Sequence, residues 1–135
     1  MRITADTNLL VRIAVKDDLE QARVAFELLS SADLVVIPLP CLCEVVWVLD
    51  SIYNFSNAEL EMAIRAIVEP RNAVVDTAVV EAGLTMLSLG GDFADAVIAA
   101  AGNIRGGEMF VSFDRKAVSR LSAMGFSAGT PRDLA

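Results

Sequence analysis

The sequence predicts an α/β fold in which helices cover both faces of a mostly parallel, five-stranded sheet, a three-layer α/β/α sandwich. The chain has 135 residues, about the size of one domain. Apolar residues make up 55% of it and charged residues 21%, enough for a packed core. Short β-rich runs alternate with longer stretches of helical period. We therefore expect residues 1–135 to form a single domain.

The strands are expected where short β-rich runs interrupt the helical pattern. Four of these runs are clear, and the fifth, near the carboxyl end, is the weakest. They are Arg2–Ala5, Leu34–Ile37, Ala73–Val75, Met109–Ser112 and Phe126–Ser127.

Capping and breaking residues mark the helices. Ser56 and Glu59 form a capping-box pattern, and glycines at 90–91, 106–107 and 125 are expected to stop helices. One helix is expected between the first two strands. The predicted helices run from a cap at Asp17 or Asp18 to about Ser30, from Pro40 to Ser51, from Ser56 to about Val68, and over Thr77–Leu89, Phe93–Asn103 and Arg115–Met124.

The composition excludes several classes of chemistry. The chain has no histidine, so histidine-based triads, histidine general bases and histidine-ligated zinc or haem are impossible. Eleven basic residues against eighteen acidic ones leave a net charge of −7, which argues against a basic coat for nucleic acid. Acid–base work would fall to carboxylates or to metal-bound water.

The remaining composition indicates a cytoplasmic protein. Cys41 and Cys43 are too few for a zinc site and too close for a useful disulfide, so we expect two core thiols in a reducing compartment. The amino terminus lacks the apolar region of a secretory signal. The longest apolar tract, Leu34 to Leu49, is interrupted by Pro38, Pro40 and Glu44 and is too short to span a bilayer.

Two acids in the first half of the chain have unusual positions: one lies in an apolar segment and the other follows the end of a strand. Glu44 is the only charged residue between Leu34 and Leu49; it could bind a cation, pair with an arginine or face solvent at a helix edge. Asp6 follows the first strand at the carboxyl end, where open parallel sheets place their ligands. Its alternative role is to cap a helical segment beginning at Thr7.

Three further acids lie in the second half of the chain. Asp92 and Asp95 have i,i+3 spacing and share a helical face. Asp92 can also be a helix N-cap, but capping explains Asp95 less well because Asp95 lies inside the helix. Asp114 follows the fourth strand and can cap the helix after it. Converging carboxylates repel one another by roughly 4 kcal/mol per pair at 4 Å and a dielectric of 20, so a shared site needs cations, and Mg²⁺ or Mn²⁺ suits carboxylate oxygen.

Over nearly its whole length the sequence resembles the PIN-domain ribonucleases, and in size the VapC-type toxins of bacterial toxin–antitoxin pairs. The resemblance lies in Asp6-Thr7-Asn8, in Glu44 within an apolar helix, in Asp95-Ala96-Val97-Ile98-Ala99-Ala100 and in Ser112-Phe113-Asp114-Arg115-Lys116.

The resemblance implies a metal-binding quartet of Asp6, Glu44, Asp95 and Asp114, which would also be the catalytic residues. Asn8 and Ser112 match polar positions that support the acids, and Asp92 is a candidate auxiliary ligand, a cap, or both. The resemblance further implies the strand order 3-2-1-4-5, endonucleolytic cleavage of RNA by Mg²⁺- or Mn²⁺-activated water, a homodimer and a cognate antitoxin.

Other readings of the residues stay open. Asp6 could be the nucleophile of a phosphatase or phosphoryl-transfer domain, although the acid expected two positions later is missing. A non-catalytic α/β binding module would need no divalent ion. The basic residues Arg105, Arg115, Lys116 and Arg120 could meet phosphate or could lie on a solvated helix face.

Overall fold

The computed structural model describes all 135 residues, which fold into two compact units, each described here by itself. Unit 1 is Met1–Asp76 and unit 2 is Thr77–Ala135. Both contain parallel strands and helices, so the predicted α/β class is confirmed. No helix is both long and apolar enough to cross a membrane.

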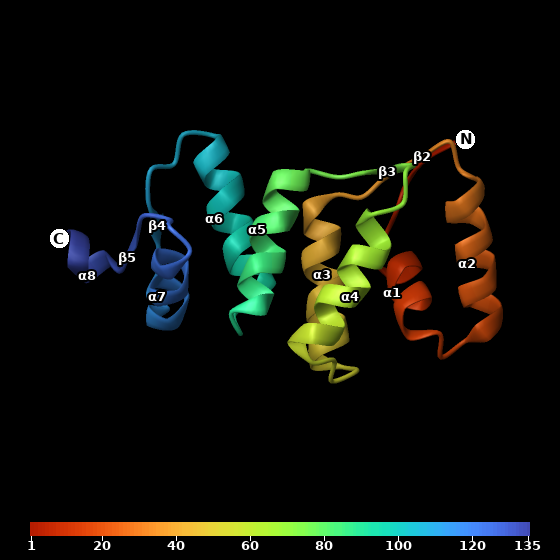
Figure 1. Ribbon diagram of the computed structural model, residues 1–135, viewed down its shortest axis with the longest axis horizontal. Helices are drawn as coiled ribbons and strands as arrows, with labels where there is room; N and C mark the ends of the chain where they lie inside the picture. The colour runs from red at the N-terminus through yellow and green to blue at the C-terminus, as the bar shows by residue number, and fades with distance from the viewer. The chain divides into compact units, whose positions relative to one another are not determined.

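Unit 1 contains a three-stranded parallel sheet and four helices (Figure 1). The strand order is β1-β2-β3, with Ile3 opposite Val35 and Val35 opposite Ala73. The strands are β1 (Arg2–Thr4), β2 (Leu34–Val36) and β3 (Ala73–Val74), and the helices are α1 (Thr7–Val15), α2 (Leu19–Ser31), α3 (Leu39–Ser51) and α4 (Asn57–Val68).

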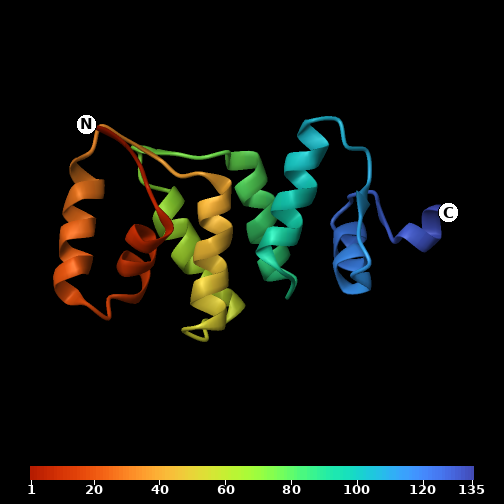
Figure 2. The same ribbon diagram turned by 180° about the vertical axis from the view of Figure 1, so that it is seen from behind.

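Unit 2 contains a two-stranded parallel sheet, with Phe110 opposite Ala128, and four helices. The helices α5 and α6 pack side by side, as both views show (Figures 1 and 2). The elements are α5 (Thr77–Ser88), α6 (Phe93–Ile104), β4 (Phe110–Val111), α7 (Arg115–Ala123), β5 (Ala128–Gly129) and α8 (Pro131–Leu134). The two sheets contain the 3-2-1 and 4-5 parts of the expected order; the five-stranded sandwich stays a prediction.

Most predicted boundaries lie within two residues of the observed ones, because local capping chemistry sets them. The Ser56–Glu59 capping box is present in both directions, and the Asp18 carboxylate accepts a hydrogen bond from the Gln21 amide at 3.0 Å. Gly90, Gly106 and Gly125 follow the ends of their helices with φ of 82°, 98° and 98°, which only glycine adopts readily.

Three predictions about the elements were wrong. Two helices, not one, connect β1 and β2, because Lys16 turns the chain with a left-handed φ of 58° after α1. The fifth strand is two residues later than Phe126–Ser127, because its pairing with β4 places Ala128 opposite Phe110 and Gly129 opposite Val111. The short helix α8, capped by Thr130 and Asp133, was not predicted.

The cysteine prediction is confirmed in part. Neither residue forms a disulfide, and Cys41 is buried, but Cys43 is only half-buried.

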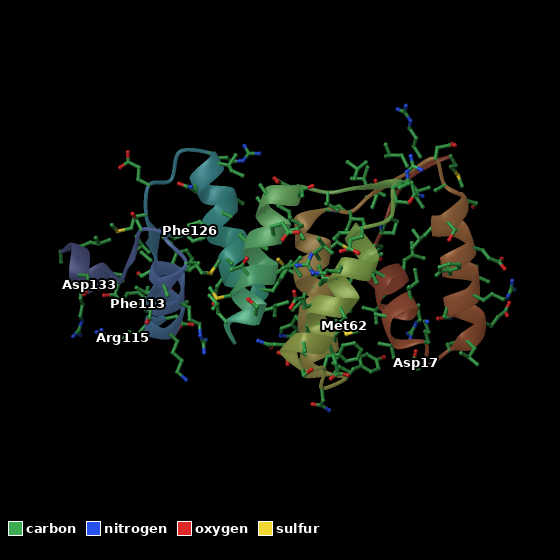
Figure 3. All side chains as sticks on the ribbon, in the orientation of Figure 1. Asp17, Met62, Phe113, Arg115, Phe126 and Asp133 are labelled. Carbon is green, nitrogen blue, oxygen red and sulfur yellow. The ribbon has the colours of Figure 1, made fainter.

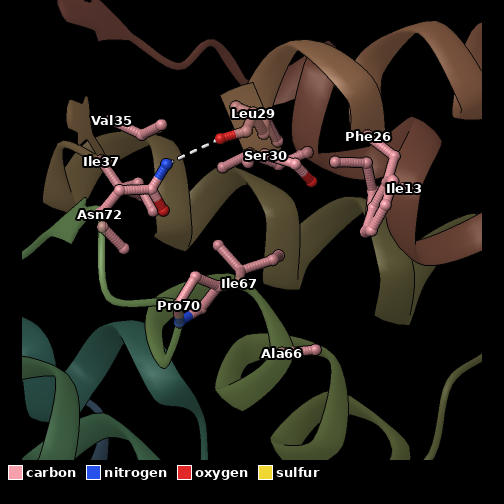
Figure 4. A pocket seen from close by; sticks show the side chains of 12 residues that line it. Ile13, Phe26, Leu29, Ser30, Val35, Ile37, Ala66, Ile67, Pro70 and Asn72 are labelled. Atoms are coloured by element: carbon pink, nitrogen blue, oxygen red, sulfur yellow. Dashed lines mark hydrogen bonds between the residues drawn. The ribbon is translucent and has the colours of Figure 1, made fainter. Parts of the chain in front are cut away.

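An apolar cavity of about 110 Å³ lies in unit 1 between α1, α2, β2 and α4 (Figure 4). The Asn72 side chain closes one side by donating hydrogen bonds to the carbonyls of Leu29 and Ala32, at 2.8 and 2.9 Å. No ionisable side chain lines the cavity, so the chemistry of the chain lies elsewhere.

Candidate metal-dependent nuclease site

The predicted site residues are divided between the two units. Asp6 and Glu44, with the supporting residue Asn8, belong to unit 1, and Asp92, Asp95 and Asp114, with Ser112, belong to unit 2. Within each unit the acids gather in one neighbourhood.

Asp6 lies at the junction of β1 and α1, where it is the N-cap residue of the helix. Its carboxylate nevertheless makes no capping hydrogen bond, whereas Asp18 in the same position of α2 does. The side chain is exposed. Capping therefore does not occupy its oxygens, and they remain available to a ligand.

Glu44 lies on the exposed face of α3, so its apolar neighbours in sequence do not bury it. Buried Val45 and Val46 follow it on the inner face of the same helix. The Thr7 hydroxyl donates a hydrogen bond to Glu44 Oε2 at 3.0 Å, which links α1 to α3. Of the roles considered for Glu44, the structure therefore shows an exposed acid at a helix edge, whose carboxylate accepts a hydrogen bond from a hydroxyl group.

Thr7 is a functional candidate that the sequence analysis missed. It is buried at the start of α1, directly after Asp6, and its hydroxyl lies 3.0 Å from Glu44 Oε2 and 3.6 Å from Cys41 Sγ. The only signal for it was its place inside Asp6-Thr7-Asn8, because the contact with α3 spans 37 positions.

The charges of Asp6 and Glu44 both act on the Cys41 thiol. Burial raises the pKa of this thiol most; the hydrogen bond from Thr7 lowers it, and the negative charges of Asp6 and Glu44 raise it further. Both carboxylates therefore act on the same small region of unit 1. Cys41 itself stays a protonated core thiol.

In unit 2, the charges of Asp92 and Asp114 act on the Asp95 carboxyl. Asp92 is the N-cap residue of α6 but makes no capping hydrogen bond, and Asp95 is half-buried in the first turn of that helix. Burial raises the pKa of the Asp95 carboxyl, the charges of Asp92 and Asp114 raise it further, and Arg120 lowers it. An ionised Asp95 is thus unfavourable unless a cation comes close.

The start of α6 is held in place by close packing. Phe93, between Asp92 and Asp95, is fully buried against Gly83 of α5, where a Cβ atom would overlap the aromatic ring. The absence of a side chain at Gly83 therefore lets α5 and α6 approach closely. This contact fixes the first turn of α6 and with it the two carboxylates.

Asp114 performs the capping role that the sequence offered as its alternative. Its Oδ1 accepts hydrogen bonds from the amides of Lys116 and Ala117, at 3.0 and 3.1 Å, at the start of α7. The Ser112 hydroxyl oxygen accepts a hydrogen bond from the Asp114 amide at 3.0 Å, so Ser112 shapes the turn between β4 and α7. Asn8 is exposed, and no hydrogen bond joins it to the acids.

Four basic residues of unit 2 are candidates for a phosphate contact: Arg105, Arg115, Lys116 and Arg120. Arg105 follows the carboxyl end of α6, and the charge of Arg115 acts on Asp133; Figure 3 labels Arg115 and Asp133. Only Arg120 acts on Asp95. The choice between a phosphate contact and a solvated helix face stays open for these residues, and Arg120 is the one that acts on a candidate acid.

The donor chemistry fits a hard divalent cation. All five candidate side chains offer carboxylate oxygens, and burial together with the charges of Asp92 and Asp114 opposes ionisation of Asp95. No three of the chain's Asp, Glu or Cys side chains are close enough to hold a metal ion as a preformed group. Asp95 with its neighbours still has the charge that a cation would offset.

The chain belongs to the PIN domain family, whose profile matches residues 3–123. Families of this kind are typically metal-dependent nucleases. The matched range includes all five candidate acids and extends over parts of both units. No curated protein sequence matches the chain.

Asp114 is both the N-cap of α7 and a candidate metal ligand, and its capping role predicts different effects for two substitutions. Asp114→Ala removes the α7 cap and should lower the free energy of unfolding by about 1 kcal/mol, whereas Asp114→Asn keeps an amide oxygen that can cap and should cost much less. Urea unfolding of both variants checks this. Equal stabilities would show that the cap contributes nothing, and Ser119→Ala, on the exposed face of α7, is the control.

Proposed function

We propose that the chain is a Mg²⁺- or Mn²⁺-dependent endoribonuclease, with Asp6, Glu44, Asp95 and Asp114 as its metal-binding and catalytic residues. The main support is the Asp95 carboxyl, which is half-buried beside two other carboxylates in a chain that belongs to a family of nucleases. The quartet is the one that the resemblance to this family implies.

Each acid has a means of being held in position. The buried Phe93 fixes the turn that carries Asp95, and the α7 cap fixes Asp114 through Oδ1, so that capping leaves its Oδ2 free. Thr7 aims Glu44, and Asp6 follows directly from β1. Asp92 adds charge beside Asp95 as an auxiliary ligand.

A divalent ion, when bound, lowers the pKa of a coordinated water and stabilises the charge on the phosphate. The carboxylates would hold that ion, and its charge would favour the ionised form of Asp95. Because the chain has no histidine, the carboxylates are the side chains available to take up the proton of the attacking water.

Asp6→Asn and Asp95→Asn should each reduce cleavage of RNA at least 100-fold and weaken Mn²⁺ binding, measured by a fluorescent RNA assay and by calorimetry. A chelator should abolish cleavage by the unaltered protein. Cleavage at the original rate by either variant would contradict the assignment.

Asp95→Asn also carries a built-in control for folding. When a carboxyl has a higher pKa in the folded than in the unfolded protein, the folded protein loses stability as the pH rises through the folded pKa. Because the pKa of Asp95 is raised, its ionised form destabilises the metal-free protein at neutral pH. The midpoint of urea unfolding should therefore rise in this variant while activity disappears. Loss of both would show that the fold, not the chemistry, was damaged.

Thr7→Val should weaken Mn²⁺ binding and cleavage about 10-fold, because it keeps the shape of the side chain but removes the donor to Glu44. Thr7→Ser keeps the hydroxyl and should retain most of the activity. The two rates, measured at saturating Mn²⁺ and at low Mn²⁺, separate a defect in metal binding from one in catalysis. Equal behaviour of Val and Ser would exclude a positioning role.

We propose in addition that the protein is the toxin of a toxin–antitoxin pair, is homodimeric and binds an antitoxin. Supporting this, Trp47 and Ile98 are 63% and 59% exposed, and a groove between α2 and α4 carries exposed Leu19, Phe26 and Met62. Figure 3 labels Met62 on α4. Such apolar surface is typical of protein interfaces.

Light scattering should give a mass of about twice 14.4 kDa for the purified chain. A small protein should copurify with it from its native source and inhibit the cleavage of RNA. A monomeric mass would contradict the dimer, and a copurified protein that leaves cleavage unchanged would contradict the toxin–antitoxin role.

The two alternative functions give different results in the same assays. A phosphoryl-transfer enzyme would form a stable acyl-phosphate on Asp6, which Asp6→Asn would abolish. A non-catalytic binding module would neither bind Mn²⁺ nor gain stability from it.

A further inference from the structure

Arg120 is a cation built into the acidic neighbourhood of unit 2. It lies in the last turn of α7, next to the fully buried Leu121, and is half-buried. Its charge acts on Asp95, which belongs to a different helix. The packing of α7 on α6 therefore sets the place of this arginine.

A glycine makes room for the Arg120 side chain. A Cβ atom at Gly91 would lie 2.9 Å from Arg120 Cδ and would also overlap the Met86 side chain. Gly91 is buried and its φ is not positive, so space rather than backbone conformation explains a glycine here. Because Gly91 directly precedes Asp92, the Arg120 stem passes beside the start of α6.

The head of Arg120 is left without a partner. Arg12, Arg23 and Arg65 form ion pairs with carboxylates on their own or adjoining segments. No ion pair or hydrogen bond engages the Arg120 guanidinium, although its charge acts on the Asp95 carboxyl. The stem is thus fixed by packing, while the five donors of the head stay available.

We propose that Arg120 binds the phosphodiester backbone of the RNA substrate beside Asp92, Asp95 and Asp114. The inference rests on the proposed nuclease function. The planar guanidinium can donate two parallel hydrogen bonds to phosphate oxygens, which a lysine cannot do in the same geometry. In a chain of net charge −7, a cation at this place also lowers the repulsion between the acids and the backbone of the substrate.

The competing role for Arg120 is that of a counter-ion that only offsets the charge of Asp95. The two roles differ in what they predict. A phosphate-binding residue governs the affinity for RNA, whereas a counter-ion governs the stability of the fold and the affinity for the metal.

The test compares Arg120→Gln and Arg120→Lys with the unaltered protein. Arg105→Gln is the matched control, because it removes the same charge at the other end of α6, about 15 Å along the helix from Asp95. For each protein, KM and kcat are measured on a short fluorescent RNA with Mn²⁺, the affinity for Mn²⁺ is measured by calorimetry, and folding is checked by urea unfolding.

Arg120→Gln should raise KM about 10-fold, with Arg120→Lys between it and the unaltered protein, and Arg105→Gln within 2-fold. The affinity for Mn²⁺ should stay the same or tighten. An unchanged KM with altered Mn²⁺ affinity or stability would overturn the proposal in favour of the counter-ion. If Arg120→Gln fails to fold, Arg120→Lys decides: a KM equal to that of the unaltered protein overturns the proposal.

The proposed function has a separate readout. If the unaltered protein neither binds Mn²⁺ nor cleaves RNA, the nuclease assignment itself fails, and the role of Arg120 fails with it. Cleavage by the unaltered protein with no effect of Arg120→Gln on KM removes only the role of Arg120.

Discussion

Repulsion between carboxylates is the constraint on which the candidate site depends. Asp95 is half-buried and its neighbours Asp92 and Asp114 carry the same charge, so its ionised form is disfavoured by desolvation and by two charges together. A structural role would be served better by an amide or an apolar residue. An arrangement that costs stability in the metal-free protein is expected where a cation completes it, as in other sites at which function is favoured over stability.

The surrounding scaffold tolerates this cost through packing and hydrogen bonds rather than through ion pairs. The contact of Phe93 with Gly83 holds the first turn of α6, the cap holds Asp114 and the Thr7 hydroxyl holds Glu44. These contacts restrict the carboxylates without neutralising them. That is what a metal-binding site requires, because a carboxylate already paired with an arginine is a poorer ligand for a cation. Arg120 agrees with this principle, since its stem is fixed while its charge remains unpaired.

Much of the fold and part of the site could be predicted from local chemistry. The capping box at Ser56, the cap at Asp18 and the glycine stops are short-range signals, and each marks a real helix end. The two helices in the connection between β1 and β2 could not be predicted in this way, because the break between them depends on a lysine, Lys16, that adopts a left-handed conformation. The fifth strand was misplaced because pairing with β4, rather than local β propensity, sets its position.

The sequence by itself determined the class of fold, the absence of histidine chemistry and the acids that merit attention, since these follow from residue types and their spacing. Only the tertiary structure decided how each acid is used. It showed that Glu44 is exposed and bound by Thr7, that Asp114 caps a helix while Asp6 and Asp92 do not, and that Arg120 alone among four basic residues acts on Asp95. The physical reason is distance along the chain: contacts such as Thr7–Glu44, 37 positions apart, arise from helix packing that no local pattern encodes.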